Sequence, residues 1–561
     1  MLASCDPSTP SASANGPACD EDVTAIAQIQ GDGWVSPLLG SEVTIRGIVT
    51  WLDSGAGFYL EDPGSDQSST SSNALYVEDK TLSHEVKPGQ KLLLTGEVLE
   101  LGKARDTLTA LSHISTHRSC AGGLELPETT LALPLNSRQR EAVESMRISL
   151  QEQLHVSDVY NFYRGGVTLS VGGKLRAPTE DLLPGKAATN AARSNRERSL
   201  RAGLSATGNP LLRRGSSIPS ASGIMGHNGR EQLLLIEQPL SSNLPPPPGL
   251  SEPGGRMIRV VSMNLLNFFN GDGAGSGFPT ERGAKNYDDF LARANRIQSA
   301  LKVIQPALVA VQELENDGFG EFSAAQSLID LLNEAVSGKW SVVQTKNGKI
   351  GNDLITVGLF YREDILEAVG SPHVLDSLPF RGLSRQPLAQ LFREHSSGAE
   401  FLVTAAHFKS KGSCPDNGIN SNQDDGQGCW NAARVEAAAA LITWVRALAR
   451  NAGTGNALIL GDINSYRQED PIRTFRNAEY RDLVEHVLGL PQYSYVFWGQ
   501  AGTLDYAFST EALLPFVRKA EFWHINTDWP QKVELPQPWL RFSDHDPLVV
   551  DLDFSQAATS D

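Results

Sequence analysis

Residues 457–464 read Ala-Leu-Ile-Leu-Gly-Asp-Ile-Asn, an apolar run that leads directly into the polar residues Asp462 and Asn464. A single Asp after a strand is usually a helix cap. The same pattern recurs, however, through residues 256–555, where apolar strands alternate with helices and end in polar residues. The six strand ends are Asn264, Glu313, His407, Asp462, Asp505 and Asp544-His545. Because strand ends at one edge of a sheet converge in space, the sequence predicts an α/β domain with a site at that edge.

The residue types at these strand ends suit the cleavage of a phosphodiester. That reaction needs the phosphate charge neutralised, a water activated and the leaving oxygen stabilised. Oxygen ligands from Asn264, Glu313 and Asp544 suit Mg²⁺ or Mn²⁺, whereas the His and Cys residues lack the clustered spacing of a zinc site. Asp505 is the natural partner to orient His545, and such a pair fixes the imidazole tautomer.

The motifs also match a known superfamily in order and spacing. They are Asn264, Gln312-Glu313, Gly461-Asp462-Ile463-Asn464, Leu504-Asp505-Tyr506 and Ser543-Asp544-His545. In these residues the chain resembles the endonuclease/exonuclease/phosphatase (DNase I-like) superfamily. The resemblance implies a four-layered α/β sandwich over residues 256–555, with two packed, largely antiparallel sheets flanked by helices.

Longer runs narrow the resemblance to the large bacterial extracellular nucleases that carry an N-terminal OB-like domain. These runs are residues 263–273, 312–318, 407–414 and 425–431. The resemblance implies an exported metal-dependent nuclease that hydrolyses extracellular DNA, with RNA left open as a second substrate. It also implies a secreted, cell-surface or periplasmic bacterial protein. Two stretches depart from that family: residues 184–230 are unusually rich in Arg, and the chain is shortened after Gly249.

The resemblance assigns metal and water roles to five residues. Asn264 and Glu313 should hold the principal metal, with Asp544 nearby. Asp462 and Asn464 should orient the attacking water and the phosphate.

The remaining catalytic and binding roles fall on His and basic residues. His545, paired with Asp505, should act as general base or as phosphate stabiliser. His407 should lie opposite, near the leaving group. Three further residues are candidate phosphate contacts, with a solvated or structural ion pair as the alternative for each: Arg385, Lys409 and Arg434.

The chain before residue 256 predicts a small β-barrel and less regular segments. Five short strands within residues 19–125 suggest a barrel of the OB type. Its aromatic residues Trp51, Phe58, Tyr59 and Tyr76 either stack on nucleic-acid bases or fill the barrel core. The other segments are a flexible tether (1–18), a mixed extension (126–240) with a flexible Arg-rich loop (184–230), and a Pro-rich linker (241–255).

The five cysteines indicate two disulfides and one further thiol. Cys414 and Cys429 flank a polar loop without hydrophobic periodicity, and Cys19 and Cys120 bracket the β-rich segment as a plausible second pair. Two disulfides imply an oxidising compartment, and scattered reduced thiols are the alternative. Cys5 follows Leu2-Ala3-Ser4, which resembles a bacterial lipobox, so we expect it to be a lipidation site that anchors the protein to a membrane. No charged and apolar regions of a signal peptide precede it.

The net charge of −17 limits how the protein can hold a polyanion. Binding by phosphate neutralisation alone normally requires a basic surface, so DNA must be held locally at the cleft. No run of apolar residues is long enough for a transmembrane helix. The acidic loop with Asp416, Asp424 and Asp425 could bind Ca²⁺, although it lacks EF-hand spacing. We expect a monomer.

Two other functions compete with the nuclease. A phosphatase or phospholipase of the same superfamily would use the same metal centre, since that centre contacts only the phosphoester. A surface nucleic-acid-binding lipoprotein with a degenerate nuclease domain is the second, and the intact residue set argues against it.

Overall fold

The computed structural model describes residues 19–53, 56–62, 70–103, 106–204, 208–228, 231–244, 246–489 and 492–555. The expected tether 1–18, with Cys5, lies outside these residues. The chain forms two compact units whose segments alternate along the sequence. The first unit combines residues up to Leu154 with Glu197–Pro210 and Ile218–Ser242, and the second combines His155–Arg196, Leu211–Ser217 and the chain from Asn243 onward.

The first unit contains a closed five-stranded barrel with the strand order β1-β2-β3-β5-β4. Its strands are β1 (Glu42–Asp53), β2 (Gly57–Glu61), β3 (Ala74–Val77), β4 (Lys91–Lys103) and β5 (Asp106–Ala121), with short helices α1 (Ile26–Gln30) and α2 (Lys80–Ser83). Alternate residues of the strands, including Val49, Phe58 and Leu94, fill the interior. A disulfide joins Cys19 to Cys120. The small β-barrel predicted from the sequence is confirmed.

A second sheet in the same unit decides the role of the barrel's aromatic residues. It is part of an eight-stranded sheet, and its strands within this unit follow the order β11-β14-β13-β7-β6. Tyr59 and Tyr76 are buried in a cluster with Ile224 of this sheet, and Phe58 lies in the barrel core. These rings are therefore core residues, and stacking on nucleic-acid bases is excluded for them. The elements are β6 (Thr129–Leu131), α3 (Ser137–Glu141), β7 (Arg147–Leu150), β11 (Ser199–Gly203), β13 (Ala221–His227) and β14 (Gln232–Ile236).

The second unit is built around two six-stranded sheets. The first sheet has the order β17-β18-β16-β15-β28-β27 and the second β19-β20-β21-β22-β26-β23. The strands of the first are β15 (Ile258–Phe268), β16 (Leu308–Glu315), β17 (Trp340–Val342), β18 (Ile355–Arg362), β27 (Val517–Phe522) and β28 (Leu548–Leu552). Those of the second are β19 (Leu366–Val374), β20 (Arg385–Glu394), β21 (Glu400–His407), β22 (Ala457–Asp462), β23 (Arg481–Asp482) and β26 (Asp505–Ser509).

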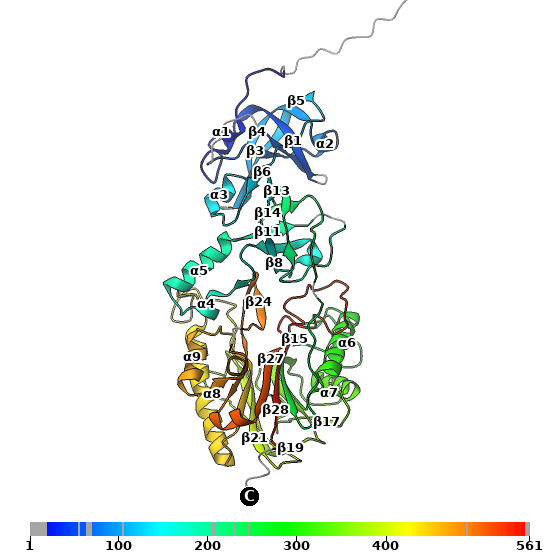
Figure 1. Ribbon diagram of the computed structural model, residues 1–561, viewed down its shortest axis with the longest axis vertical. Helices are drawn as coiled ribbons and strands as arrows, with labels where there is room; N and C mark the ends of the chain where they lie inside the picture. The colour runs from blue at the N-terminus through cyan, green and yellow to red at the C-terminus, as the bar shows by residue number, and fades with distance from the viewer. Residues whose placement is uncertain are drawn as a thin grey trace, which may run out of the picture. The chain divides into compact units, whose positions relative to one another are not determined.

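Both sheets are apolar on both faces, which is why they can form the two inner layers. Val260 and Leu308 of the first sheet pack against Val403 and Leu458 of the second, while Val261 points the other way, toward helix α6. Helices α6 (Tyr287–Ile304) and α7 (Ala324–Ala335) cover the first sheet, and α8 (Asn431–Ala452) and α9 (Asp470–Asn477) cover the second (Figure 1). Helix α10 (Leu483–Leu488) follows β23. The predicted four-layered α/β sandwich is confirmed.

Part of the chain expected to be irregular is instead folded against this sandwich. The Arg-rich loop predicted over residues 184–230 contains helix α5 (Lys186–Glu197), and β10 (Leu175–Arg176) pairs with β25 (Gln500–Gly502). Only Ala188 and Asn195 of α5 are buried, so the helix carries little apolar periodicity from which it could be predicted. The neighbouring elements are β8 (Leu154–Asp158), η1 (Phe162–Arg164), β9 (Gly166–Ser170), α4 (Pro178–Asp181), β12 (Ser217–Ile218), β24 (Tyr495–Phe497) and η2 (Glu511–Phe516).

The Pro-rich stretch expected to separate two domains also belongs to the second unit from Asn243 onward. The indole Nε1 of Trp523 donates a hydrogen bond to the carbonyl of Pro248 (2.9 Å). Within the described part of the chain, none of the helices is both long and apolar enough to span a bilayer.

Candidate active site

The strand register of the second sheet brings three of the predicted residues side by side. Asp462 ends β22 and lies opposite His407 at the end of β21 and Asp505 at the start of β26. All three are buried. Their proximity follows from the sheet itself. Asp462 is the last residue of β22, and the other two residues end or begin the strands that pair with β22 on either side.

The first sheet supplies Asn264 and Glu313 to the same centre. The side-chain amide of Asn264 donates from Nδ2 to Glu313 Oε1 (3.1 Å) and to Asp462 Oδ2 (3.3 Å). Asn264 thus links the two sheets across the edge where their strands end. The conformation of Glu313 is unusual, with φ 61°, where the pairing of β16 with β18 shifts register. A bulge of this kind turns a side chain away from its regular direction.

A short left-handed turn after Asn264 holds these two side chains in place. Leu266 and Asn267 have φ of 51° and 54°, and their amides donate to Asn264 Oδ1 and Glu313 Oε2 (both 2.9 Å). Arg293 of α6 donates to the carbonyls of Leu266 (2.5 Å) and Asn267 (2.7 Å). Burial lowers the pKa of Arg293 to about 10, against the attraction of Glu313 and Asp544, so it remains charged at neutral pH.

His545 and Asp505 form the pair that the sequence predicts. The imidazole Nδ1 donates to Asp505 Oδ2 at 2.7 Å, and Nε2 then points toward Asp462 Oδ2 at 3.9 Å. Burial alone would lower the pKa of His545, but the carboxylates of Asp505 and Asp462 outweigh it and raise the pKa well above its usual value. The two carboxylates thus favour the charged form of His545.

Serine hydroxyls fix the segments that carry this pair. Ser543 Oγ donates to the carbonyl of Asn264 (2.6 Å) and accepts from the amide of His545 (3.3 Å). Ser494 Oγ accepts from the amides of Leu504 (3.0 Å) and Asp505 (3.1 Å). Ser543 thus ties the loop that bears His545 to strand β15, and Ser494 ties the start of β26 to the segment before β24.

The second histidine of the centre, His407, favours the neutral form, in contrast to His545. Burial, with the charges of Arg385 and His545, lowers the pKa of His407 well below its usual value. Its Nε2 lies 3.6 Å from Asp462 Oδ2, and within the described residues its Nδ1 has no hydrogen-bond partner. A neutral imidazole thus faces a charged one across Asp462.

Asp462 is at the middle of this arrangement. Burial raises its pKa to about 7, His545 opposes that shift, and Asp505 and Glu313 add to it. Its Oδ1 accepts from the amide of Asn464 (2.9 Å), whose backbone is left-handed with φ 53°. A carboxyl with a pKa near neutrality can exchange a proton under working conditions.

The donor set fits a divalent cation. Burial and then Asp544 raise the pKa of Glu313, so the centre crowds carboxylates that would repel one another without a positive charge between them. Ligand atoms of Asp462, Asp505 and His545 also lie within 4.8 Å of one another. His545 Nδ1 is already bonded to Asp505, whereas the oxygens of Asn264, Glu313 and Asp544 are the kind of donor that a hard cation takes.

Of the three basic residues proposed as phosphate contacts, Arg385 lies closest to the centre. It pairs across the strands with His407, and its Nε lies 3.3 Å from Asp353. Lys409 instead donates from Nζ to the carbonyls of Ser410 and Gly412 (both 3.0 Å) and lies over the Trp430 ring at 5.1 Å.

The prediction that Arg434 contacts phosphate is corrected by its surroundings. Its side chain is fully buried. It donates to Ser465 Oγ (3.0 Å) and to the carbonyls of Cys429 (2.8 Å), Lys409 and Gln427 (both 3.3 Å). With its donors bound to the chain itself, Arg434 holds the loop before α8 rather than a substrate.

That loop is closed by the predicted disulfide between Cys414 and Cys429, so both predicted cysteine pairs form. Its acidic residues Asp416, Asp424 and Asp425 do not gather into a metal-binding group in the part of the chain that the structure describes.

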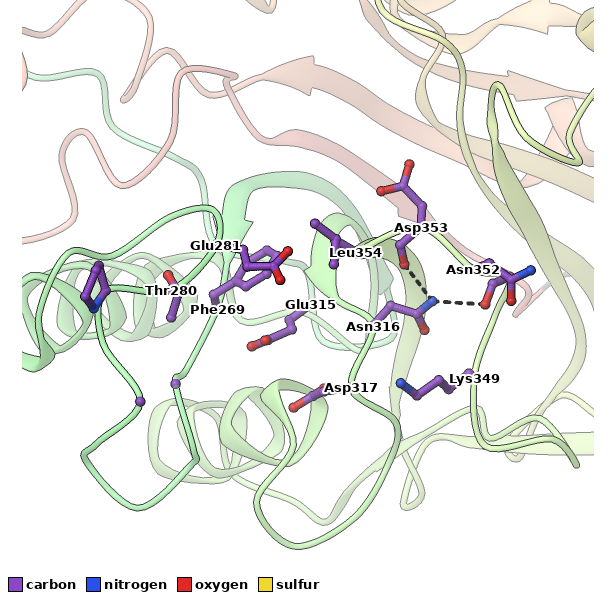
Figure 2. A pocket seen from close by; sticks show the side chains of 14 residues that line it. Phe269, Thr280, Glu281, Glu315, Asn316, Asp317, Lys349, Asn352, Asp353 and Leu354 are labelled. Carbon is purple, nitrogen blue, oxygen red and sulfur yellow. Dashed lines mark hydrogen bonds between the residues drawn. The ribbon is translucent and has the colours of Figure 1, made fainter.

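A cavity of about 500 Å³ is lined in part by residues at and just beyond the ends of strands β15 and β16, among them Phe269 and Asn316 (Figure 2). Its lining includes Glu315, Asp317 and Lys349. Asn316 donates from Nδ2 to the carbonyls of Ile350 and Asp353 (both 3.0 Å), which fixes the loop on the far side of the cavity.

Sequence reasoning missed three residues of the site. Arg293 binds the carbonyls of the left-handed turn described above, which has no sequence signature. Tyr495 lies with its ring centroid 4.6 Å from that of His545. Glu180, from the segment expected to be a mixed extension, accepts from the amide (2.9 Å) and hydroxyl (3.0 Å) of Thr503, two residues before Asp505. A local signal for Glu180 is its position four residues after Arg176, with which it forms an ion pair (3.7 Å).

Comparison with known proteins agrees with this fold. The sequence model of the Endonuclease/Exonuclease/phosphatase family matches residues 261–545, just over half of the 561-residue chain. The chain therefore belongs to that family, whose members are hydrolases acting on phosphoester bonds. No curated protein matches the chain.

A search of solved structures also finds similar chains, all at low sequence identity and with TM-scores below 0.5. An endonuclease/exonuclease/phosphatase from Bacteroides vulgatus is 19% identical, with 53% of this chain and 98% of that chain covered and a TM-score of 0.37. A mannosyl-6-phosphatase from Bacteroides thetaiotaomicron is 20% identical, with 53% and 100% covered and a TM-score of 0.37. The D. rerio TDP2 complexed with single strand DNA product is 15% identical, with 53% and 99% covered and a TM-score of 0.34.

Proposed function

We propose that this hydrolase is an exported, metal-dependent nuclease that cleaves the phosphodiester bonds of extracellular DNA, with RNA as a second substrate to be tested. The observation that carries the proposal is the convergence of the strand-end residues on Asp462. Asn264 joins it from the other sheet, and His407 and His545 flank it in opposite charge states.

In this proposal the metal is held by Asn264, Glu313 and Asp544. Mg²⁺ or Mn²⁺ bound there supplies positive charge to the scissile phosphate. Arg293 fixes the turn that orients Asn264 and Glu313, so the two ligands are preorganised before an ion binds.

The proton-handling residues are Asp462, Asn464, His545, Asp505 and His407. Asp462, with a pKa of about 7, accepts the proton of the attacking water, and Asn464 orients that water. His545, kept charged by Asp505, stabilises the phosphate. His407, which is neutral, lies on the side of the leaving oxygen.

The substrate is held at the cleft rather than by the overall charge, which is −17. Arg385 is the cation best placed for a phosphate, because it is a strand neighbour of His407. Its ion pair with Asp353 keeps the guanidinium in place without occupying all five of its donors.

Export is proposed on chemical grounds. Two disulfides, Cys19–Cys120 and Cys414–Cys429, persist in an oxidising compartment and rarely in a reducing one. We propose that the protein acts outside the cytoplasm, with Cys5 as the residue to test for a lipid anchor.

A substrate panel tests the function against its competitors. Plasmid, linear DNA, RNA, a phosphomonoester and phospholipid vesicles are each incubated with the protein in Mg²⁺ or in EDTA, and again with the His545→Ala variant. We expect DNA cleavage in Mg²⁺ that is lost in EDTA and in the variant. Hydrolysis of the phosphomonoester or phospholipid without DNA cleavage would establish the phosphatase or phospholipase instead. Binding of DNA without any hydrolysis would establish a degenerate binding protein.

A further inference from the structure

The hairpin formed by β24 and β25 carries a row of three aromatic rings that starts at the catalytic histidine. Tyr495 lies 4.6 Å from His545 between ring centroids. Phe497 lies 6.5 Å from Tyr495 with nearly parallel planes (15°), as expected for residues two apart on one face of a strand. Trp498 continues the row at 5.9 Å from Phe497.

The row passes from the site to the solvent. Phe497 is 55% exposed and Trp498 is 68% exposed, whereas His545 is only 6% exposed. Single exposed apolar residues are normal on protein surfaces. Here, however, two adjacent exposed rings are connected to the site, because Phe497 lies next to Tyr495 and Tyr495 lies next to His545.

The backbone at the tip of the hairpin holds the tryptophan in a strained conformation. Phe497 pairs with Gln500, so Trp498 and Gly499 form a two-residue turn, and both are left-handed with φ of 50° and 76°. Such turns normally take Asn, Asp or Gly at the first position. A bulky residue with positive φ is strained there, and retained strain of this kind is typical of functional positions.

We propose that Tyr495, Phe497 and Trp498 form a stacking platform for the unpaired bases of the strand whose phosphodiester lies in the active site. The proposal rests on the proposed nuclease function and names the form of its substrate. Aromatic rings stack on any base, so the platform recognises a single strand or a frayed end without reading its sequence. In an intact duplex the base faces are covered by their neighbours. The occupant is the substrate itself, because the row begins at His545.

The test uses two changes at the tip and one matched control on the full chain. Trp498→Asn removes the ring and places a residue that suits the left-handed turn, so the variant should unfold at the same or a higher temperature than the wild type. Trp498→Phe keeps a ring. Phe322→Ala removes a ring that is also largely exposed (58%, against 68% for Trp498) but lies outside the row.

Binding is measured in EDTA, where no cleavage is expected, with a fluorescently labelled single-stranded oligonucleotide and with a blunt duplex of the same sequence. We expect Trp498→Asn to weaken single-strand binding by about tenfold, consistent with the loss of one stacked base. Duplex binding should change by less than about twofold, and Trp498→Phe and Phe322→Ala should bind the single strand as the wild type does. In Mg²⁺, the ratio of kcat/KM for the oligonucleotide to that for bis(p-nitrophenyl) phosphate should fall in parallel.

Three results would overturn the platform. The first is single-strand binding by Trp498→Asn equal to wild type. The second is no single-strand binding by the wild-type protein. The third is a change in sedimentation of Trp498→Asn without a change in oligonucleotide binding, which would assign the tip to contact with a second copy of the chain. Failure of the nuclease proposal is seen separately, as intact nucleic acid in Mg²⁺, because the binding measurement does not depend on cleavage.

Discussion

Both units of the chain bury acidic side chains, and the comparison shows which feature marks a site. In the first unit, Glu144 is buried, and its Oε1 accepts from the amide of Thr109 (2.9 Å). Burial, followed by Glu141, raises its pKa to about 8, so it is a neutral hydrogen-bonding group at pH 7. In the second unit, Asp462 also has a raised pKa, but it faces two histidines and an amide that links two sheets.

The carboxyls of Glu144 and Asp462 are both buried, and they differ in the side chains that surround them. The carboxyl of Glu144 is satisfied as a protonated group within a core, and it needs no cation. In the second unit, three carboxyls lie close to two histidines, one favouring the charged form and one the neutral form; these carboxyls belong to Asp462, Glu313 and Asp505. This concentration of carboxyls favours a bound cation. A raised pKa alone therefore does not identify a catalytic residue in this protein.

The largest effect separating the two units should come from His545. His545→Ala removes the imidazolium between Asp505 and Asp462 and should lower kcat on DNA by about 10²–10⁴-fold, the range for a positioned proton-handling group. Glu144→Gln, the matched change in the first unit, should leave kcat at the wild-type value. Steady-state rates on a linear DNA measure both. Equal losses in the two variants would mean that activity responds to stability rather than to the site.

Next in size is the effect of removing a proposed metal ligand. Glu313→Gln keeps the shape of the side chain but removes its charge, so the Mg²⁺ concentration for half-maximal activity should rise by about 10–100-fold. An Mg²⁺ titration of activity measures this shift. An unchanged midpoint with a lower plateau would contradict a ligand role and leave Glu313 as a positioning residue.

Substituting two arginines of the second unit should distinguish an arginine that stabilises the fold from one that contacts the substrate. Arg434→Met leaves buried carbonyls without donors and should destabilise the protein by about 2–4 kcal/mol. Arg385→Met should leave stability within about 1 kcal/mol and lower kcat/KM on DNA by about tenfold. Denaturant unfolding and kinetics on the same preparations test the pair. Reversed outcomes would show that the buried arginine contacts substrate.

The smallest predicted effect is a pH dependence of stability in the first unit. Glu144 has a folded-state pKa of about 8, against 4.5 as its ordinary value. Between these values the folded state holds a proton that the unfolded state releases, so stability is highest below about pH 4.5 and falls until pH exceeds about 8.

Glu144→Gln removes that titration. Thermal unfolding at pH 5.5 and pH 8.5 should show a loss of Tm in the wild type that is smaller in the variant by a few degrees. Identical losses in both proteins would place the proton elsewhere, for example on Glu61, whose pKa burial raises to about 7.

The sandwich and most of its centre could be predicted because the information is local. Asp462 and His407 directly follow apolar strands, so their positions at the sheet edge follow from strand direction alone. Arg434 could not be assigned, because a charged residue in the first turn of a helix has the same sequence pattern whether it faces solvent or buried carbonyls. Its partners come from a loop that is close to it only after the disulfide and β22 are in place.

Other parts depend on contacts between distant segments. Helix α5 buries only Ala188 and Asn195, and its composition is that of a solvated loop. Arg293 matters because Leu266 and Asn267 take left-handed conformations, which no residue type there requires. Tyr59 and Tyr76 of the barrel are buried because they pack against strand β13. That strand lies more than 140 residues along the chain from Tyr76, so the sequence near these residues does not reveal the contact.

The central claim is that the convergence on Asp462 is a metal-dependent phosphodiesterase centre that acts on DNA. The most direct test is a time course on covalently closed circular DNA with metal-stripped wild-type protein, before and after Mg²⁺ is restored, beside His545→Ala. The account predicts intact circles without metal, nicked and linear products after Mg²⁺ is restored, and intact circles with the variant under both conditions. Cleavage in the stripped protein, or equal cleavage by His545→Ala, would contradict it.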